Sequence, residues 1–337
     1  MEVTNCSQRS LVIQDLSQVS EARRIAQSMA NDLQLNEIRR GQAGIIVTEA
    51  ARNVFLHGRG GEIVLCPWTD NEGGGLDIVA IDKGPGMEDV ARCLRDGYST
   101  TGTSGNGLGA ISRLADRFEI WSAAGQGTAI LARVLNKRNP SPDSFLTGTI
   151  SVPITGETEC GDNWAELHTV DRSVFIVTDG LGHGRAAAEA SREAIKVFRQ
   201  VPELSPEKML LRIHNALKST RGAAAAIAEI DIPQRQIRYA GVGNILASVW
   251  SNGTSHSMAS HNGTLGHNLL RVQEFSYLWP AQSILIMHSD GLNSHWDLRR
   301  YPGLAFKQPR LLAAVLYRDS KRGRDDATIL VSRESSK

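Results

Sequence analysis

The sequence predicts two successive α+β domains, and three observations lead to this prediction. The chain has 337 residues, which is long for one hydrophobic core and sufficient for two. The polar stretch NKRNPSPDSF at residues 136–145 contains two prolines and is typical of a linker. On each side of it, helical patterns and apolar strands occur together, as in domains that pack helices on a sheet. We therefore expect a first domain at residues 1–137, a linker at 138–146 and a second domain at 147–337.

The composition narrows the class of protein. A hydrophobic content of 41% and a charged content of 22% are ordinary for a globular protein. The net charge of +1 argues against binding nucleic acid or a membrane surface through bulk charge. No apolar run approaches the roughly 20 residues of a membrane span, and the polar start EVTNCSQRS lacks a signal-peptide pattern. The four cysteines show no metal-ligand spacing, which is typical of a reducing compartment. We expect a cytoplasmic protein with no membrane or nucleic-acid partner.

The first half predicts three helices, four strands and a glycine-rich loop. Apolar residues at helical spacing mark helices at 19–33 and 37–57. The strands are EIVLCPW, LDIVAID, RFEIWSA and TAILARVL, and the loop TTGTSGNGLG leads into a short helix before the third of them. Such a loop can direct backbone N–H groups and a helix N-terminus at phosphates.

Acidic and amide side chains accompany this loop. In EAARN, Glu49 and Asn53 stand four residues apart and share a helix face. In IDKGPGM, Asp82 ends a strand just before two glycines. An aspartate there can accept from an exocyclic amino group, and an asparagine oxygen suits Mg²⁺. Each motif alone is weak, because a lone glycine repeat is common, but their joint order is specific. Together they predict a nucleotide pocket.

The order of these motifs resembles the N, G1 and G2 boxes of the GHKL (Bergerat-fold) ATPases over residues 10–135. Within them it is most similar to the RsbT group of anti-sigma-factor serine kinases, which ARRIAQSMANDL, EAARN and RDGYSTTGTSGNGLG echo. The resemblance implies an ATP-binding α/β sandwich in which Asn53 holds the Mg²⁺ of ATP, Asp82 reads adenine and Glu49 is the catalytic base. It also implies a pocket lining of Gly84, Gly86, Gly105, Gly107, Gly109 and Thr128.

Histidine kinases share this fold but need a helical phosphoacceptor domain ahead of the ATPase. Only a short stretch precedes the first predicted helix, so we do not expect a histidine kinase. His57 follows Asn53 on the same helix, and we interpret it as a partly buried structural histidine.

The second half predicts strands with two interior helices near 185–199 and 206–218. The strands are SVFIVTD, AAAIAEIDI, QIRYAGVG, ILASVW, SILIMHSD and ATILVS. We interpret AGVGN, at residues 240–244, as a turn between strands with no chemistry of its own.

Aspartates recur at the strand ends and turns of this half: Asp162, Asp179, Asp290 and the pair Asp325–Asp326. A lone Asp-Gly is usually only a turn, but carboxylates gathered at one end of a sheet repel one another unless cations lie between them. Oxygen ligands favour Mg²⁺ or Mn²⁺ over zinc. The pattern therefore predicts a metal site.

The order GD…DGxGHG…SDG…DDAT resembles the PPM-type Ser/Thr phosphatases, specifically the SpoIIE/RsbX branch, over residues 147–333. The resemblance implies a β-sandwich with flanking helices and two Mn²⁺ or Mg²⁺ ions, which activate water for attack on phosphorus. Asp179 would bridge the two ions, with the Gly180 carbonyl on one of them. Asp162 would serve the first ion, directly or through water, and Asp290 and Asp325 the second.

Two details depart from the usual pattern or stay open. His183 stands four residues after Asp179, whereas other PPM enzymes place a proposed general acid directly after the Asp-Gly pair. A catalytic role for His183 and a structural or phosphate-orienting role are both open. Asp325 is preferred over Asp326 as a ligand because the family pattern places the ligand there.

Two functions are compatible with these sites. In the first, the chain is a bifunctional partner-switching regulator whose kinase and phosphatase act on STAS-domain proteins, in a stressosome-like or anti-sigma assembly. In the alternative, the first domain is an ATP-dependent binding module for a sigma factor or antagonist, and only the phosphatase is catalytic. Glu49 favours the kinase, because a binding module needs no carboxylate there. Hydrolysis of a small phosphate ester is disfavoured, because the family acts on folded proteins.

Overall fold

The structure, a computed structural model, describes residues 4–5, 7–70, 73–94, 107–136 and 145–335. Its contacts divide the chain into two compact units. The ATPase unit comprises Thr4–Ser141 and Leu298–Arg318, and the phosphatase unit comprises Pro142–Asp297 and Asp319–Lys337. Each unit is described separately below.

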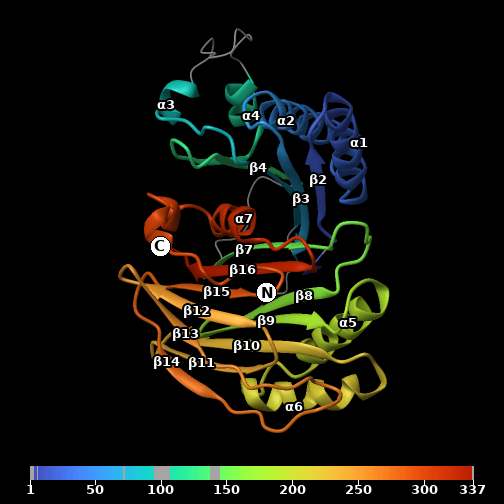
Figure 1. Cartoon of the computed structure of the whole chain (residues 1–337), viewed down its shortest axis with the longest axis vertical. Helices are drawn as coiled ribbons and strands as arrows, with labels where there is room; N and C mark the ends of the chain where they lie inside the picture. Colours follow the sequence, from blue (N-terminus) through green and yellow to red (C-terminus); the bar gives the residue numbers. More distant parts are fainter. Residues whose placement is uncertain (1–3, 6, 71–72, 95–106, 137–144, 336–337) are drawn as a thin grey trace. The chain divides into compact units, whose positions relative to one another are not determined.

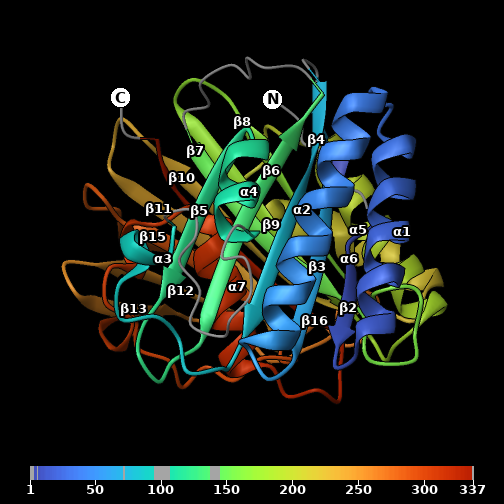
Figure 2. The same ribbon diagram turned by 90° about the horizontal axis from the view of Figure 1, so that it is seen from above.

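The ATPase unit is built on an antiparallel sheet in the order β1-β3-β4-β6-β5, with β2 also paired to β3. Helices α1, α2 and α4 cover one face of this sheet (Figure 2). The strands are β1 (Thr4–Asn5), β2 (Arg9–Ile13), β3 (Gly61–Asp70), β4 (Gly73–Asp82), β5 (Arg117–Ser122) and β6 (Thr128–Leu135). The helices are α1 (Leu16–Asp32), α2 (Glu37–Leu56), α3 (Val90–Cys93) and α4 (Gly107–Leu114).

The two long helices begin at polar caps and meet through small side chains. Asp15 caps α1 in a reciprocal capping box with Gln18, and the Asn36 side chain accepts from the Arg39 N–H at the start of α2. The buried face of α1 carries Ala22 and Ala26, which are fully buried. Small residues let α1 lie close to α2, which in turn packs on the sheet and so fixes the face that carries Glu49 and Asn53.

The phosphatase unit contains two antiparallel five-stranded sheets, in the orders β14-β11-β10-β9-β8 and β13-β12-β15-β16-β7. The strands of the first sheet are β8 (Asp162–His168), β9 (Arg172–Gly180), β10 (Ala223–Asp231), β11 (Gln236–Val242) and β14 (Phe275–Leu278). Those of the second are β7 (Phe145–Val152), β12 (Leu246–Ser251), β13 (Thr254–Met258), β15 (Ile284–His288) and β16 (Ala327–Glu334). The helices that lie wholly within this unit are α5 (Arg185–Gln200) and α6 (Pro206–Ala216), followed by the 3-10 turn η1 (Leu217–Ser219).

Alternation along β9 shows how the layers of the phosphatase unit form. Phe175 and Val177 belong to the core between the two sheets, together with Leu285 and Leu330 of the second sheet. Ile176 points the opposite way, into the core that α5 and α6 form on the outer face of the first sheet. The predicted fold class, a β-sandwich with flanking helices after an ATP-binding α/β sandwich, is confirmed.

Several elements were not predicted from the sequence. Strands β2, β7, β8, β13 and β14 are short or of mixed polarity, and their periodicity is weak. The third helix of the second half, α7 (Pro309–Ser320), was also missed, because Leu311–Leu316 are buried on every side and form no amphipathic stripe. Of the predicted linker at 138–146, the last two residues belong to β7, where Phe145 packs on Phe175, and the rest lies outside the described residues.

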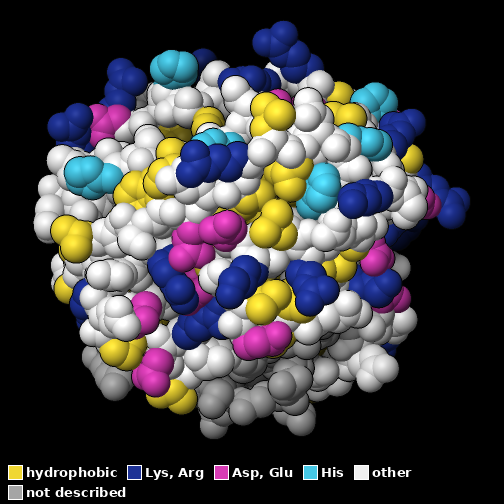
Figure 3. Space-filling view, turned by 90° about the horizontal axis from the view of Figure 1, so that it is seen from below, with side chains coloured by type: hydrophobic (Ala, Val, Ile, Leu, Met, Phe, Trp, Pro, Cys, Tyr) yellow, Lys and Arg dark blue, Asp and Glu magenta, His cyan; other side chains and the backbone are white. Residues whose placement is uncertain are grey.

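The surface of the phosphatase unit carries charges of both signs. Figure 3 shows that lysines and arginines lie interspersed with acidic side chains and histidines on the face seen from below. Among the residues that the structure describes, no helix is long and apolar enough to cross a membrane.

Candidate functional sites

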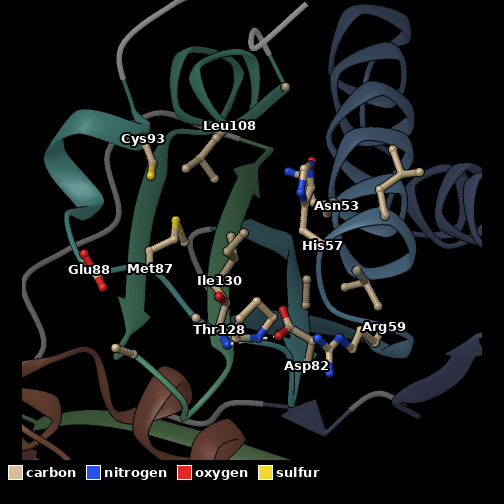
Figure 4. A pocket seen from close by; sticks show the side chains of 18 of the residues that line it. Asn53, His57, Arg59, Asp82, Met87, Glu88, Cys93, Leu108, Thr128 and Ile130 are labelled. Atoms are coloured by element: carbon tan, nitrogen blue, oxygen red, sulfur yellow. Dashed lines mark hydrogen bonds between the residues drawn. The ribbon is translucent and has the colours of Figure 1, made fainter. Parts of the chain in front are cut away.

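A cavity of about 670 Å³ opens in the ATPase unit among α2, β4, β6 and α4. This volume lies within the usual range for small-molecule and cofactor sites. Figure 4 shows Asn53 and His57 reaching it from α2, Asp82 and Thr128 from the sheet, and Leu108 from α4. The structure thus places residues of the first two motifs, and the described end of the third from Gly107, around one cavity.

Asp82 lies at the floor of the cavity and is only 9% exposed. Its Oδ1 accepts from the Gly84 N–H at 2.8 Å and from the Thr128 N–H at 3.2 Å. Burial raises the pKa of the Asp82 carboxyl, although the two backbone donors oppose the shift. Because both donors use Oδ1, Oδ2 can accept from the amino group of a base.

The glycines after Asp82 allow a close backbone approach. Gly86 has a φ of +70°, and a Cβ added to it would lie 2.0 Å from the Ala123 carbonyl oxygen. Any larger residue there would push the Pro85–Gly86 turn away from the cavity that it lines. Gly84 is also close to a backbone carbonyl, since a Cβ added to it would lie 2.7 Å from the His57 oxygen.

Glu49 and Asn53 meet the first residue of α4. A Cβ on Gly107 would lie 2.8 Å from Glu49 Oε2 and 3.6 Å from Asn53 Oδ1. A carboxylate, an amide oxygen and a helix start therefore converge at one end of the cavity. Gly109 is buried two residues further along α4, and Gly105 lies outside the described residues.

His57 follows α2 and lines the cavity wall half-buried, as Figure 4 shows. This partial burial agrees with the interpretation of His57 as a partly buried histidine. Arg59, also at the wall, is exposed and was not singled out by the sequence.

The aspartates of the phosphatase unit gather at strand ends from both sheets. Asp162 at the start of β8 pairs in register with Asp179 near the end of β9. Asp290 follows β15 and Asp325 precedes β16, in the other sheet. We call Asp162, Asp179, Asp290 and Asp325 the carboxylate cluster.

Asn244 links two members of the carboxylate cluster. Its Nδ2 donates to Asp179 Oδ2 at 3.2 Å and to Asp290 Oδ2 at 2.7 Å. The interpretation of AGVGN as a turn without chemistry is therefore wrong for its last residue. The Asp-Gly spacing drew attention to the acidic residues, whereas a single asparagine after a glycine offered no separate signal.

Burial and mutual repulsion shift the acidity of the cluster. Burial, with added repulsion from Asp290 and Asp325, raises the pKa of Asp179 to about 7. Burial and the neighbouring Asp179 raise the pKa of Asp162 well above its ordinary value. Oδ2 of Asp162 accepts from the Ser289 hydroxyl at 2.6 Å, but Oδ1 is buried without a hydrogen-bond partner among the described residues.

Asp325 and Asp326 differ in their surroundings. Asp326 Oδ1 accepts from the Ile154 N–H and Oδ2 from the Gly161 N–H, both at 2.7 Å. Asp326 therefore pins both ends of the loop between β7 and β8. Asp325 Oδ1 accepts from the Asp326 N–H at 2.9 Å, and in the described part of the chain Asp325 has no such double tether. Its charge acts on Asp179. This arrangement favours Asp325 as the ligand of the two.

Gly180 lies directly against the first turns of α5. A Cβ on it would lie 2.1 Å from the Ala187 carbonyl oxygen, so no side chain fits there. The glycine therefore lets β9 end close to the helix that follows the DGLGHG turn.

His183 lies between two left-handed glycines, Gly182 (φ +88°) and Gly184 (φ +73°), and its side chain is 60% exposed. Its Nδ1 is 2.9 Å from Glu157 Oε1. Glu157 comes from the loop that Asp326 pins, so the histidine has an acidic partner from a separate segment. The sequence contained no sign of this pairing, because the two residues are 26 positions apart.

The residues of the carboxylate cluster fit a divalent metal by their chemistry. In the described part of the chain, no three Asp, Glu, His or Cys side chains already stand in a metal-holding arrangement. Instead, the Asn244 amide bridges Asp179 and Asp290, and Asp162 keeps a buried oxygen without a partner. An oxygen donor set with repelling carboxylates and an unpartnered buried oxygen is suited to a hard cation.

Comparison with known families defines two classes. Residues 12–134 match the family model described as histidine kinase-like ATPase domain, and residues 169–334 match that of stage II sporulation protein E (SpoIIE). The chain thus joins a histidine-kinase-like ATPase domain to a SpoIIE-class phosphatase domain.

Individual relatives identify the branch of each class. The first is serine/threonine-protein kinase RsbT of Bacillus subtilis (strain 168), 36% identical over 111 residues, 33% of this chain and 84% of the relative. The second is phosphoserine phosphatase RsbX of the same organism, 30% identical over 139 residues, 41% of this chain and 70% of the relative. The chain therefore belongs to the RsbT family in its first part and to the RsbX family in its second, and the predicted fusion is confirmed.

Solved structures give the same fold for the phosphatase part. One similar solved structure is described as "The bacterial stressosome: a modular system that has been adapted to control secondary messenger signaling". It is 26% identical with a TM-score of 0.53, and the match covers 57% of this chain and all of the other. RsbX in complex with magnesium shares 24% identity with a TM-score of 0.50, covering 58% of this chain and 98% of the other. At that identity, the second match supports the fold alone.

Proposed function

We propose that the chain is a bifunctional partner-switching regulator of the cytoplasm. Its ATPase unit phosphorylates a serine or threonine, and its phosphatase unit hydrolyses phosphoserine or phosphothreonine. The observation that supports this proposal is the pair of separate sites in one chain, one with a base beside a nucleotide cavity and one with repelling carboxylates suited to metal.

In the kinase site, each residue has a distinct task. Asp82 Oδ2 accepts from the adenine amino group, and Asn53 would hold the Mg²⁺ that accompanies ATP. Glu49 faces the start of α4 next to Asn53, which supports its role as the base that accepts the proton of the incoming hydroxyl. The N-terminus of α4, with Gly107 and Gly109, would stabilise the phosphates.

In the phosphatase site, the carboxylate cluster and the Gly180 carbonyl would hold two Mn²⁺ or Mg²⁺ ions. Such a pair supplies a nucleophile at neutral pH and neutralises charge on the phosphoryl group. Asp179 would bridge the ions, while Asp162 would serve one and Asp290 and Asp325 the other. His183, oriented by Glu157, is our candidate for donating a proton to the departing serine oxygen.

The names of the relatives support the proposed substrate class. RsbT is named a serine/threonine-protein kinase and RsbX a phosphoserine phosphatase, and one similar solved structure is described under the bacterial stressosome. We propose STAS-domain proteins as substrates, within an anti-sigma or stressosome-like assembly.

The decisive experiment measures phosphate transfer in a chain that cannot erase its product. Asp179→Asn protein is used to capture partners from the native cytosol, and transfer of labelled phosphate from ATP to each partner is then followed and mapped. Transfer to a serine or threonine of a STAS protein is the expected result. Binding of partner and ATP without any transfer would contradict the kinase assignment and support the binding-module alternative.

A further inference from the structure

One segment of the second half belongs to the ATPase unit. Leu298–Arg318 clusters with Thr4–Ser141, although its position in the sequence is between Asp290 and Asp325 of the carboxylate cluster. It comprises the 3-10 turns η2 (Leu298–Arg300) and η3 (Leu304–Phe306) and nearly all of α7. The chain thus leaves the phosphatase unit after one proposed metal ligand and returns before the next.

This segment lies on the face of the ATPase sheet opposite to α1 and α2 (Figure 1). Along β4, Ile78 and Ala80 face the helix-covered core, so Asp77 points to the other face. The contacts of the segment are made on that other face: the Tyr317 hydroxyl donates to Glu62 of β3 at 3.0 Å, and Trp121 Nε1 of β5 donates to the Pro302 carbonyl at 3.0 Å.

A buried ion pair fixes the segment in place. The Asp77 carboxylate is fully buried. It forms ion pairs with Arg133, at 2.6 Å from Nε to Oδ1, and with Arg310 of α7, at 2.8 Å from Nε to Oδ2. Burial alone would raise the pKa of Asp77, but the two guanidinium groups outweigh it and lower the pKa. Removing one partner of such a group is strongly destabilising, so the position of α7 on β4 is well determined.

The next contact reaches the nucleotide pocket itself. Arg318 Nη1 donates to the Asp82 backbone carbonyl at 2.9 Å, and its guanidinium lies 5.6 Å from the ring centre of Trp121. The carboxyl of the same Asp82 forms the floor of the cavity. A side chain of α7 therefore holds the residue that we assign to adenine recognition.

The C-terminal end of α7 is tied to the other site. The Asn293 N–H donates to the Ser320 carbonyl at 2.8 Å, and the Arg322 N–H donates to the Gly291 carbonyl at 2.9 Å. These bonds lie directly after Asp290 on one side and shortly before Asp325 on the other. Arg318, which bonds within the ATPase unit, and Ser320, which bonds within the phosphatase unit, are two residues apart in the same helix.

We propose that α7 couples the two sites, so that nucleotide in the cavity tightens metal binding at the carboxylate cluster. The proposal rests on the proposed functions of both sites. A base bonded to Oδ2 of Asp82 adds a contact at the end of β4 and further stabilises the carbonyl position that Arg318 holds. This favours the bonded position of α7 and of residues 319–326, which carry Asp325. Two sites that bias one element are coupled reciprocally, typically by about 5–150-fold in affinity.

The test uses the full chain and two readouts. The Mn²⁺ concentration for half-maximal hydrolysis of p-nitrophenyl phosphate is measured with and without the non-hydrolysable analogue AMP-PNP, at buffered free Mn²⁺. Amide hydrogen exchange of residues 319–326 is followed under the same conditions, and nucleotide binding is checked by calorimetry. AMP-PNP is expected to lower the half-saturating Mn²⁺ concentration by about fivefold or more and to slow the exchange.

Two α7 variants locate the coupling. Arg318→Gln is expected to bind nucleotide and retain basal hydrolysis while both responses are lost. Tyr317→Phe removes the neighbouring contact with Glu62 instead and is expected to keep them. Bound nucleotide without any change in either readout would overturn the proposal, as would a full response in Arg318→Gln. If AMP-PNP slows the exchange of residues 319–326 but the chain hydrolyses no substrate, the phosphatase assignment is overturned and the coupling is supported. Should Arg318→Gln not fold, the wild-type responses alone decide.

Discussion

The two acidic sites differ in how their carboxylates are satisfied. Asp82 of the ATPase unit has two backbone donors on one oxygen, and an arginine holds its carbonyl. In the carboxylate cluster, Asp162 keeps a buried oxygen without a partner in the described chain, and Asp179 depends on an asparagine amide shared with Asp290. The first site is pre-organised without its ligand, whereas the second is held apart by repulsion until a cation or a proton enters.

This difference predicts what each site loses on substitution. A pre-organised pocket should lose one specific contact and keep its shape. A repelling cluster should lose its ligand altogether when a bridging charge is removed, while the metal-free fold becomes less strained.

Asp179→Asn should abolish hydrolysis of a phosphoserine peptide in Mn²⁺. The bridging position loses its charge, and we expect a fall on the order of 10³-fold or more, since removing even one oriented transition-state donor costs about 10²–10³-fold. Peptide hydrolysis with Mn²⁺ and with excess EDTA measures the effect. Asp171→Asn, in the exposed turn before β9, is the matched control and should be fully active. Undiminished hydrolysis in EDTA would contradict the two-metal assignment.

Glu49→Gln should separate phosphate transfer from ATP binding. The amide keeps the size of the side chain but cannot accept a proton, which typically costs about 10²–10⁴-fold in rate. Transfer to the captured partner in the Asp179→Asn background gives the rate, and calorimetry gives the ATP affinity, which should hardly change. Glu37→Gln, in the first turn of the same helix, serves as control. Equal loss of affinity and rate would show that Glu49 acts through binding.

Asp82→Asn should weaken ATP binding and leave the fold intact. The amide oxygen can keep the Gly84 and Thr128 bonds, so the NH₂ group then faces the adenine amino group as donor against donor. The expected cost is about 1–3 kcal/mol, or roughly 5–150-fold in affinity. Calorimetry against wild type and the exposed control Asp32→Asn measures it. Wild-type affinity in Asp82→Asn would mean that adenine binds elsewhere.

The metal-free protein should lose stability as the pH rises from about 4 to about 7. The unfolded chain releases the Asp179 proton near its ordinary pKa of about 3.9, whereas the folded chain keeps it up to a pKa of about 7. The stability that this proton gives the folded state is therefore fully present below the unfolded-state pKa. It is lost as the pH rises through the folded-state pKa. Mn²⁺ replaces it, so the Tm difference between Mn²⁺-loaded and EDTA-treated protein should widen over this window, by about 2–4 °C per kcal/mol. The EDTA-treated Asp179→Asn variant should show a flatter profile, and an identical one would refute this origin.

The sequence points to candidate residues where they lie in short motifs. Asp82 and the four aspartates could be selected because a strand, a turn and a polar residue stand together in the chain, and Asn53 because it shares a helix face with Glu49. The sequence was insufficient where contacts join distant segments: Asn244 on Asp179, Glu157 on His183 and Arg318 on Asp82 are separated by 26 to 236 residues. Helix α7 was not predicted for another reason. Its central residues, Leu311–Leu316, are all buried, so it lacks the amphipathic pattern by which helices are predicted.

The smallest expected effect concerns the pair formed by Glu157 and His183. Both side chains are partly exposed, and such a pair is worth about 0.2–1 kcal/mol, so Glu157→Gln should slow phosphoserine hydrolysis by no more than about fivefold. If His183 protonates the departing serine oxygen, hydrolysis of p-nitrophenyl phosphate should be unaffected, because that leaving group departs without a proton. Glu159→Gln is the matched control, since Glu159 lies in the same loop but pairs with Arg192 at 2.7 Å. Equal slowing on both substrates would instead indicate that Glu157 supports the loop that Asp326 pins, and would leave His183 without an acid role.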